Sequence, residues 1–295
     1  MNAPLIRHRP VVQVVFPSGS CQHHQDAFFK GIGTLETAGF SVRYNAQRVQ
    51  ESWRDYLSGT DTTRFHELTS ALSDPDVDIV WFGRGGSGCN RITPKVIEYA
   101  KTIDSKIVVG FSDATSLLNG LAQHLRWTTY HGPVVTTLGR DDSQTDVSQI
   151  LQLLRGQKQT IALHPALHDA SFAGRLYGGN LTVIASMLGT PYAPVSQPDA
   201  IWLLEDVGEA PYRLDRSFRQ LVDSGLFDQA SAIWLGDFDQ THQGQEYIER
   251  LFRKDAPCPV LNHAPAGHQG PLACLPIGAH VTISGRTMSA EWVRA

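Results

Sequence analysis

The sequence predicts an α/β protein whose strands form a parallel sheet. Short apolar runs, such as VVQVVF at 11–16, end at glycine or proline residues, and each is followed by a longer segment with apolar residues at helical spacing. Alternation of this kind implies a parallel sheet. With 295 residues, the chain is long enough for two domains of about 150 residues, either of which can bury a core.

The first half of the chain repeats this strand–helix pattern. Gly39 closes the first predicted helix, and Asp61 is the expected N-cap of the second. Leucine and alanine residues at helical spacing mark the apolar face of the last helix. The expected elements are strands at 11–16, 40–44, 78–82 and 106–110, and helices at 26–38, 62–72, 94–101 and 114–124.

The alternation of strands and helices is interrupted near the middle of the sequence. The stretch DDSQTDVSQILQLLRGQKQT, which begins at Asp141, is polar, and the strand–helix pattern resumes only with GRLYGGNLTVIASMLGTPY at 174–192. We therefore expect an N-terminal domain over 1–150, a linker over 151–174 and a C-terminal domain over 175–295. The second half is expected to contain strands at 201–204 and 231–235, helices at 211–223 and 243–253, and late strands near Val260, Val281 and Met288.

Composition and charge exclude several classes of function. The net charge of −4, without a basic cluster, argues against nucleic acid as a partner, and a small or peptide substrate fits better. Nowhere do about 18 apolar residues run together, and the start of the chain lacks the apolar stretch of a signal peptide. We therefore expect a soluble, cytoplasmic protein with no membrane contact. Its four scattered cysteines are expected to be reduced.

Two segments raise the question of a cofactor or a metal ion. The glycine-rich GRGGSG at 83–88 lacks the lysine and the hydroxyl residue of a P-loop and does not match G-x-G-x-x-G, so no nucleotide cofactor is expected. CQHHQD at 21–26 gathers a cysteine, two histidines and an aspartate. Because their spacing matches no standard zinc site, a solvated loop is favoured and no metal is expected.

A serine stands at a tight corner, GFSDA, after the last strand of the first half. Ligands of open α/β sheets bind beyond the carboxyl ends of the strands, and Ser112 lies at such an end, directly before a helix. A sharp turn there exposes the hydroxyl and leaves the next N–H groups unpaired, so the corner can supply a nucleophile and anion-binding donors. The hydrolase motif G-x-S-x-G is not met, since Ala114 takes its last position, and Ser112 can equally be a plain helix cap.

A serine nucleophile needs a base, and the base needs a group that orients it. Glu205 ends the strand AIWLLED and could interact with an imidazole, although a carboxylate at a loop edge is the simpler explanation. His268 lies in NHAPAGHQGP, a glycine- and proline-rich loop from which a side chain can be aimed at a cleft. It is one of 12 histidines, so its position alone does not single it out.

Seven blocks, in a fixed order over nearly the whole chain, indicate one family. They are VVFPSG at 14–19, GRGGSGCNRITP at 83–94, GFSDATSLL at 110–118, HGP at 131–133, GGNLTVIASMLGTPY at 178–192, LLEDVGEAPYRLDR at 203–216 and GH at 267–268. In this order and spacing, the blocks resemble the LD-carboxypeptidase family of serine peptidases. That family includes the murein tetrapeptide carboxypeptidases and the microcin C self-immunity peptidases.

The resemblance implies a fold and a catalytic triad. The fold is a flavodoxin-like, glutamine-amidotransferase-like N-terminal domain and a smaller β-rich C-terminal domain, with the active site between them and two chains in a homodimer. The triad is Ser-His-Glu, with Ser112 as the nucleophile, His268 as the general base and Glu205 as the orienting carboxylate. Glu209 lies four residues further on, but the spacing to the histidine in the family favours Glu205.

The resemblance also implies an oxyanion hole, made by the backbone N–H groups of Gly85 and Asp113. A carboxypeptidase must in addition bind a free carboxylate, for which a guanidinium is the best partner. Arg84 is our candidate, although it could instead form a structural salt bridge. Gly86 and Ser87 are further candidate substrate contacts, and Ser87 stands where the family more often has an aromatic residue.

The substrate implied by the resemblance is the murein tetrapeptide of peptidoglycan recycling, which would lose its terminal D-alanine by hydrolysis of an L,D bond. Within the family, the alternative is a microcin-type aminoacyl nucleotide amide. Outside it, the alternative is a non-catalytic ligand-binding protein of the same fold class. Asn180 and His131 lie in family blocks, but the sequence assigns them no chemistry.

Overall fold

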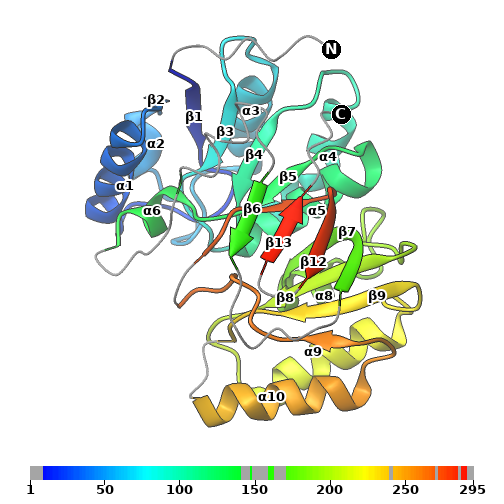
Figure 1. Ribbon diagram of the computed structural model, residues 1–295. Helices are drawn as coiled ribbons and strands as arrows, with labels where there is room; N and C mark the ends of the chain where they lie inside the picture. Colours follow the sequence, from blue (N-terminus) through cyan, green and yellow to red (C-terminus); the bar gives the residue numbers. More distant parts are fainter. Residues whose placement is uncertain are drawn as a thin grey trace.

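The structure, a computed structural model, describes residues 9–140, 147, 159–162, 171–238, 242–269, 272–284 and 287–290. These residues form two sheets with helices around them, which confirms the predicted α/β class (Figure 1). The first sheet has six strands in the order β11-β5-β4-β3-β1-β2. They are β1 (Val11–Val15), β2 (Ser41–Arg43), β3 (Ile79–Phe82), β4 (Ile107–Gly110), β5 (Thr129–His131) and β11 (Leu275–Ile277).

The first five strands of this sheet run parallel, and β11 joins β5 in the antiparallel direction. Starting from β2, the parallel strands have the order 2-1-3-4-5, which is that of flavodoxin-like doubly wound sheets. The winding direction reverses between β1 and β3. In such sheets ligands bind at this point, beyond the carboxyl ends of the strands, so the loops after β1, β3 and β4 line the expected binding edge.

Helices cover both faces of the first sheet. Ile79 and Trp81 of β3 belong to the same buried cluster as Phe28, whereas Val80 and Phe82 belong to the cluster of the opposite face. Because successive strand residues point to opposite faces, a strand covered on both sides is apolar throughout. One face carries α1 (Gln25–Thr37) and α6 (Val135–Leu138), and the other carries α3 (Asp61–Ser73), α4 (Cys89–Ala100) and α5 (Thr115–Leu125). The short α2 (Ala46–Gln50) follows β2.

The second sheet has seven strands in the order β10-β9-β8-β7-β12-β13-β6. β7 connects two parts of it, because its second half pairs with β8 in parallel and its first half pairs with β12 in the antiparallel direction. The helices α9 (Pro211–Asp223) and α10 (His242–Asp255) of this half lie at the bottom of Figure 1. The elements are β6 (Gln159–Ala162), β7 (Ser171–Asn180), α8 (Leu181–Met187), β8 (Ala200–Glu205), α9 (Pro211–Asp223), β9 (Ala230–Leu235), α10 (His242–Asp255), β10 (Val260–Leu261), β12 (His280–Ser284) and β13 (Thr287–Ala290).

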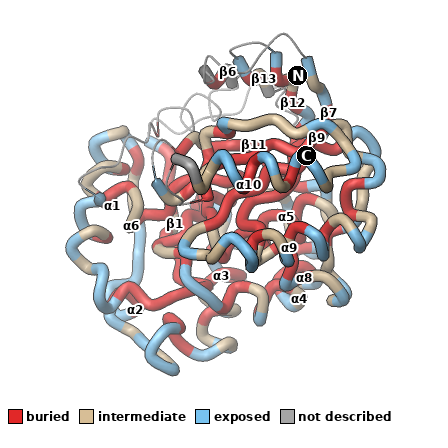
Figure 2. Tube along the Cα trace, turned by 90° about the horizontal axis from the view of Figure 1, so that it is seen from below, coloured by how far each residue is buried: buried red, intermediate tan, exposed pale blue. Residues whose placement is uncertain are grey.

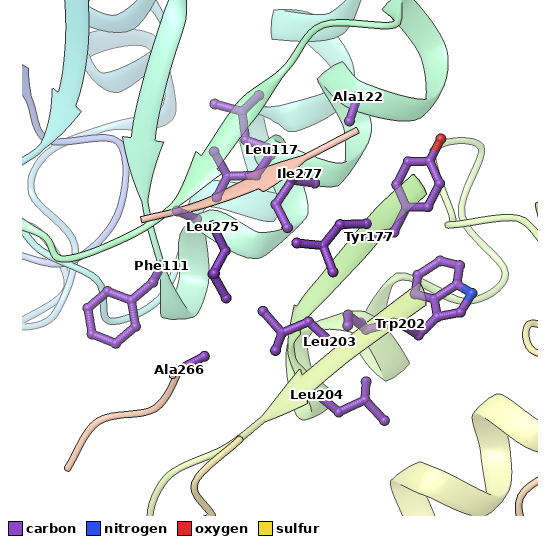
Figure 3. Packing of buried hydrophobic residues seen from close by; sticks show 14 of the residues in the cluster. Phe111, Leu117, Ala122, Tyr177, Trp202, Leu203, Leu204, Ala266, Leu275 and Ile277 are labelled. Carbon is purple, nitrogen blue, oxygen red and sulfur yellow. The ribbon is translucent and has the colours of Figure 1, made fainter. Parts of the chain in front are cut away.

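One apolar core connects the two sheets. Leu117 of α5, Leu275 of β11 and Leu203 of β8 belong to a single buried cluster (Figure 3). Buried segments run through the middle of the molecule, whereas the outer turns of α1, α9 and α10 carry exposed residues (Figure 2). The two halves therefore share buried surface rather than meeting through solvated contacts.

Helix α4 begins at Cys89, five residues before the predicted start at Pro94. A proline inside a helix removes one N–H donor, which here would have bonded to the carbonyl of Asn90. Tyr192, from the second half of the chain, donates its hydroxyl to that carbonyl at 3.0 Å. The Asp113 carboxylate accepts from the N–H of Cys89 at 2.8 Å and so supplies the cap of the helix. Both partners are distant in sequence, which is why the local pattern missed them.

The structure also corrects one predicted helix cap and adds one strand that was not predicted. Thr60, not Asp61, is the N-cap of α3, because its side chain accepts from the N–H of Thr63. Asp61 instead receives two hydrogen bonds from Arg91, at 2.8 and 2.6 Å. The strand β11 was not predicted at all, and it brings a segment from near the end of the chain into the N-terminal sheet.

Candidate active site

Ser112 occupies the strained corner that follows β4. Its φ of +60° lies in the left-handed region, which costs a residue other than glycine about 1–3 kcal/mol. The turn is tightly packed and excludes a side chain at Gly110, because a methyl group there would lie 2.8 Å from the Cβ of Ala114. Among the described residues, neither the 3-10 turn Ser112–Ala114 nor α5 has a side-chain cap, so this serine does not act as the plain helix cap. Strain of this kind is common at functional sites.

The glycine loop after β3 lies directly against this corner. A methyl group on Gly85 would lie 3.1 Å from the Cβ and 3.3 Å from the Oγ of Ser112. The carbonyl of Gly85 accepts from the N–H of Gly19, in the loop after β1, at 2.9 Å. On the other side, the buried carboxylate of Asp113 holds the N–H of Cys89. Burial raises the pKa of that carboxyl, and the hydrogen bond from Cys89 opposes the shift.

Glu205 and His268 are hydrogen-bonded in the second half of the chain. The Nδ1 of His268 lies 2.9 Å from the Oε2 of Glu205, which is fully buried at the end of β8. Arg140 donates to the backbone carbonyl of His268 at 3.0 Å. The ring of His268 also packs on Phe111, with centroids 4.7 Å apart. The imidazole therefore lies beside the residue that precedes Ser112.

The charges around the imidazole favour its protonated form. Burial lowers the pKa of His268, but the hydrogen bond and the charge of Glu205, with Asp206 and Asp237 nearby, outweigh this, and the net pKa lies above its ordinary value. Burial raises the pKa of Glu205, and the hydrogen bond with His268 opposes that shift. Within the described part of the chain, no hydrogen bond connects Ser112 to His268 in this structure.

The three candidate substrate contacts lie on the glycine loop. Arg84 donates to the carbonyl of Ser20 at 3.0 Å and forms no ion pair among the described residues, so a structural salt bridge is not what holds it. Gly86 has a φ of +104° and packs against Gly19. Ser87 is exposed and has no hydrogen bond in the described part of the chain. These contacts hold Arg84 and Gly86 against the loop after β1. None of the contacts described for Arg84, Gly86 and Ser87 is with Ser112.

Sequence reasoning missed a polar clamp that connects the two halves next to the site. Asn119, within the apolar stripe of α5, accepts from the N–H of Gly178 at 2.8 Å and donates to its carbonyl at 2.9 Å. One turn earlier, Thr115 accepts from the N–H of Asn180 at 3.0 Å. Asn180 pairs in register with Glu205, so the clamp fixes α5, which follows Ser112, relative to β8, which ends at Glu205. A lone asparagine in a leucine-rich stripe was the signal available in the sequence.

Other features of the described residues bear on metals and membranes. No three of their histidine, cysteine, aspartate and glutamate side chains are grouped in a way that could hold a metal ion. Cys21, in the segment that gathers possible metal ligands, is buried, and burial raises the pKa of its thiol to about 12. No helix in the described ranges has the length and apolar character needed to cross a membrane.

Comparison with known proteins identifies the enzyme class and the family of this chain. The N-terminal domain of LD-carboxypeptidases matches residues 12–132, and the C-terminal domain of the same peptidases matches residues 173–283. Both belong to peptidases, so the class is that of hydrolytic enzymes. This chain is a member of the LD-carboxypeptidase family.

Individual relatives agree with this membership. The murein tetrapeptide carboxypeptidase of Pseudomonas aeruginosa is 32% identical over 271 residues, which are 86% of this chain and 87% of the relative. The microcin C7 self-immunity protein MccF of Escherichia coli is 25% identical over 296 residues, or 88% and 86% of the two chains. The crystal structure of muramoyltetrapeptide carboxypeptidase from Oxalobacter formigenes superposes with a TM-score of 0.80 at 25% identity, covering 95% of this chain and 97% of that one.

Proposed function

We propose that this protein is a serine LD-carboxypeptidase that removes the terminal D-alanine from murein tetrapeptide. The observation that carries the proposal is the 2.9 Å hydrogen bond between Glu205 and His268, whose ring packs on the residue before Ser112. A carboxylate, an imidazole and a strained hydroxyl in this order are the parts of a hydrolytic triad. The 32% identity to a murein tetrapeptide carboxypeptidase supports the choice of substrate.

In the proposed reaction, the Oγ of Ser112 attacks the carbonyl carbon of the L,D peptide bond while the Nε2 of His268 takes its proton. The N–H groups of Gly85 and Asp113 stabilise the oxyanion that forms. The C–N bond then breaks, and D-alanine leaves with the proton from His268. Water, deprotonated by the same imidazole, hydrolyses the acyl-enzyme. Glu205 keeps the hydrogen on Nδ1, so that Nε2 is the basic atom.

Arg84 is the proposed partner of the terminal carboxylate. Its guanidinium is half-buried, and among the described residues it forms no ion pair and makes a single hydrogen bond, so donors remain for a ligand. The exposed Gly86 and Ser87 would border the bound peptide. A carboxylate held there would explain a preference for the last residue of a peptide, because internal peptide bonds offer no such group.

A mass-spectrometric assay with L,D-linked and D,D-linked tetrapeptides tests the proposal. We expect release of D-alanine from the L,D-linked peptide alone, abolished in Ser112→Ala and unchanged in Ser186→Ala, which alters an exposed serine of α8. A fluorophosphonate probe should label the protein but not Ser112→Ala. If Ser112→Ala keeps full activity, the mechanism is wrong. If the probe labels neither protein and no peptide is cleaved, the non-catalytic alternative is favoured.

A second substrate follows from the 25% identity to a microcin self-immunity protein. An aminoacyl nucleotide amide would present its carbonyl to the same serine. The same assay, run with that compound, ranks the two substrates by kcat/KM. The homodimer and the cytoplasmic location implied by the family remain predictions, which sedimentation velocity and cell fractionation test.

A further inference from the structure

One aromatic side chain contacts two histidine rings at the junction of the two sheets. Phe111 is 4% exposed and immediately precedes Ser112. Its ring centroid is 4.7 Å from that of His268, with the planes inclined by 47°. Its centroid also lies 5.9 Å from that of His131, with the planes at 79°. The imidazole of His268 is thus held twice, by Glu205 through Nδ1 and by Phe111 through its ring.

Contact with a phenyl ring favours a charged imidazole. The face of an aromatic ring carries partial negative charge, and a cation within about 6 Å of the centroid is attracted to it, more strongly where water is excluded. In the proposed reaction, His268 becomes positively charged each time it takes the proton of Ser112. The centroid of the Phe111 ring lies 4.7 Å from that of this imidazole, which is within the range of such an attraction.

Other charged groups also act on His268. Glu205, Asp206 and Asp237 contribute negative charge and raise its pKa. Arg140 donates to the backbone carbonyl of His268 at 3.0 Å. A test of the phenyl ring must therefore leave all four of these groups in place.

The second histidine contacts the same phenyl ring and adds no charge near pH 7. Both ring nitrogens of His131 are buried and have no hydrogen-bond partner among the described residues. Burial, together with the charge of His268, lowers the pKa of His131 to about 3, so it is neutral near pH 7. Its ring stands almost perpendicular to that of Phe111.

We propose that Phe111 is a positioning residue for the general base: its ring, which packs on the imidazole of His268, holds that imidazole in place and stabilises its protonated form. The catalytic part of this inference rests on the proposed function. The contact between the two rings can be measured without any substrate, so the inference and the function can fail separately.

The experiment replaces Phe111 with trifluorophenylalanine in the full chain. Fluorination keeps the shape of the ring but withdraws the negative charge from its face. The imidazole of His268 is titrated by NMR after labelling of histidine, with His268→Gln to assign its signal. The matched control carries the same residue at Phe28, which lies in the core on the other face of the N-terminal sheet. Phe111→Leu, which removes the ring, is titrated in parallel.

We expect the pKa of His268 to fall by about half a unit to one unit in both position-111 variants, and to be unchanged in the control. On murein tetrapeptide, kcat should fall several-fold in the fluorinated variant while KM stays the same. If the fluorinated protein titrates like the wild type, the inference is wrong, even when Phe111→Leu is impaired, because packing alone then explains the contact. Absence of peptidase activity in the wild type would refute the proposed function and leave the titration result standing.

Discussion

Adding one methyl group to Gly85 should lower turnover strongly at little cost in stability. Gly85 does not have a positive φ, so alanine is compatible with the backbone there. The new Cβ, however, would lie 3.1 Å from the Cβ and 3.3 Å from the Oγ of Ser112. Carbon atoms in contact normally stay at least about 3.5 Å apart, so the loop and the corner must separate by roughly half an ångström.

This displacement sets the size of the effect. It moves both the attacking hydroxyl and a proposed oxyanion donor, and a misplacement of about 1 Å costs on the order of 10²-fold in rate. Because the shift is about half of that, we expect kcat of Gly85→Ala to fall roughly 10-fold, with KM nearly unchanged. The free energy of unfolding should fall by only about 1 kcal/mol, at the low end for an overpacked site.

The assay combines D-alanine release with urea denaturation. Gly33→Ala is the matched control, because Gly33 lies inside α1 with no atom within 4 Å of the added methyl group. That variant should keep wild-type turnover and gain about 0.5–1 kcal/mol of stability from helix propensity. Wild-type turnover in Gly85→Ala would refute the reasoning, because the glycine loop would then not bear on the reacting hydroxyl.

Three further predictions concern the acid, the clamp and the pH profile. Glu205→Gln should lower kcat by about 10²–10⁴-fold. It should not lower the urea midpoint, because it replaces a buried carboxylate with a neutral amide. The control Glu209→Gln should match the wild type in both assays. Asn119→Ala leaves the buried N–H and carbonyl of Gly178 without their Asn119 partners. The free energy of unfolding, measured by urea titration, should therefore fall by about 2–3 kcal/mol. An unchanged urea midpoint would contradict a stabilising role of these hydrogen bonds. Because the pKa of His268 is raised and the base must be neutral, kcat/KM should decline as the pH falls through a value above the ordinary 6.5, and an acid limb below 6.5 would count against this base.

Sequence patterns predicted the elements better than the contacts between them. Helix α9 was predicted with the bounds Pro211–Asp223 because proline at the first helical position and an apolar stripe are local signals. The early start of α4 was missed because a proline is typical of the first helical position, whereas here Pro94 lies inside the helix and Tyr192 satisfies the carbonyl of Asn90. The strand β11 contains Pro276 and has three residues, so no periodicity could reveal it, although an edge strand accepts a proline.

The same distinction holds for the site. Ser112 stands out from the residues alone, because a strand end followed at once by a helix is visible in the pattern. Glu205 and His268 came from the resemblance, since their hydrogen bond spans 63 residues of chain and no spacing rule predicts such a contact. The carboxylate of Asp113 and the ring of Phe111 escaped notice because both act through partners that only folding brings near.

The pairing of β11 with β5 has a consequence for biosynthesis. As the protein leaves the ribosome, β5 is complete long before Leu275 is made, and until then the edge of the sheet at β5 lacks its antiparallel neighbour. Open strand edges invite intermolecular pairing. A gene cut after the first sheet's helices would therefore yield a fragment prone to aggregate, whereas co-expression of the missing half should rescue it.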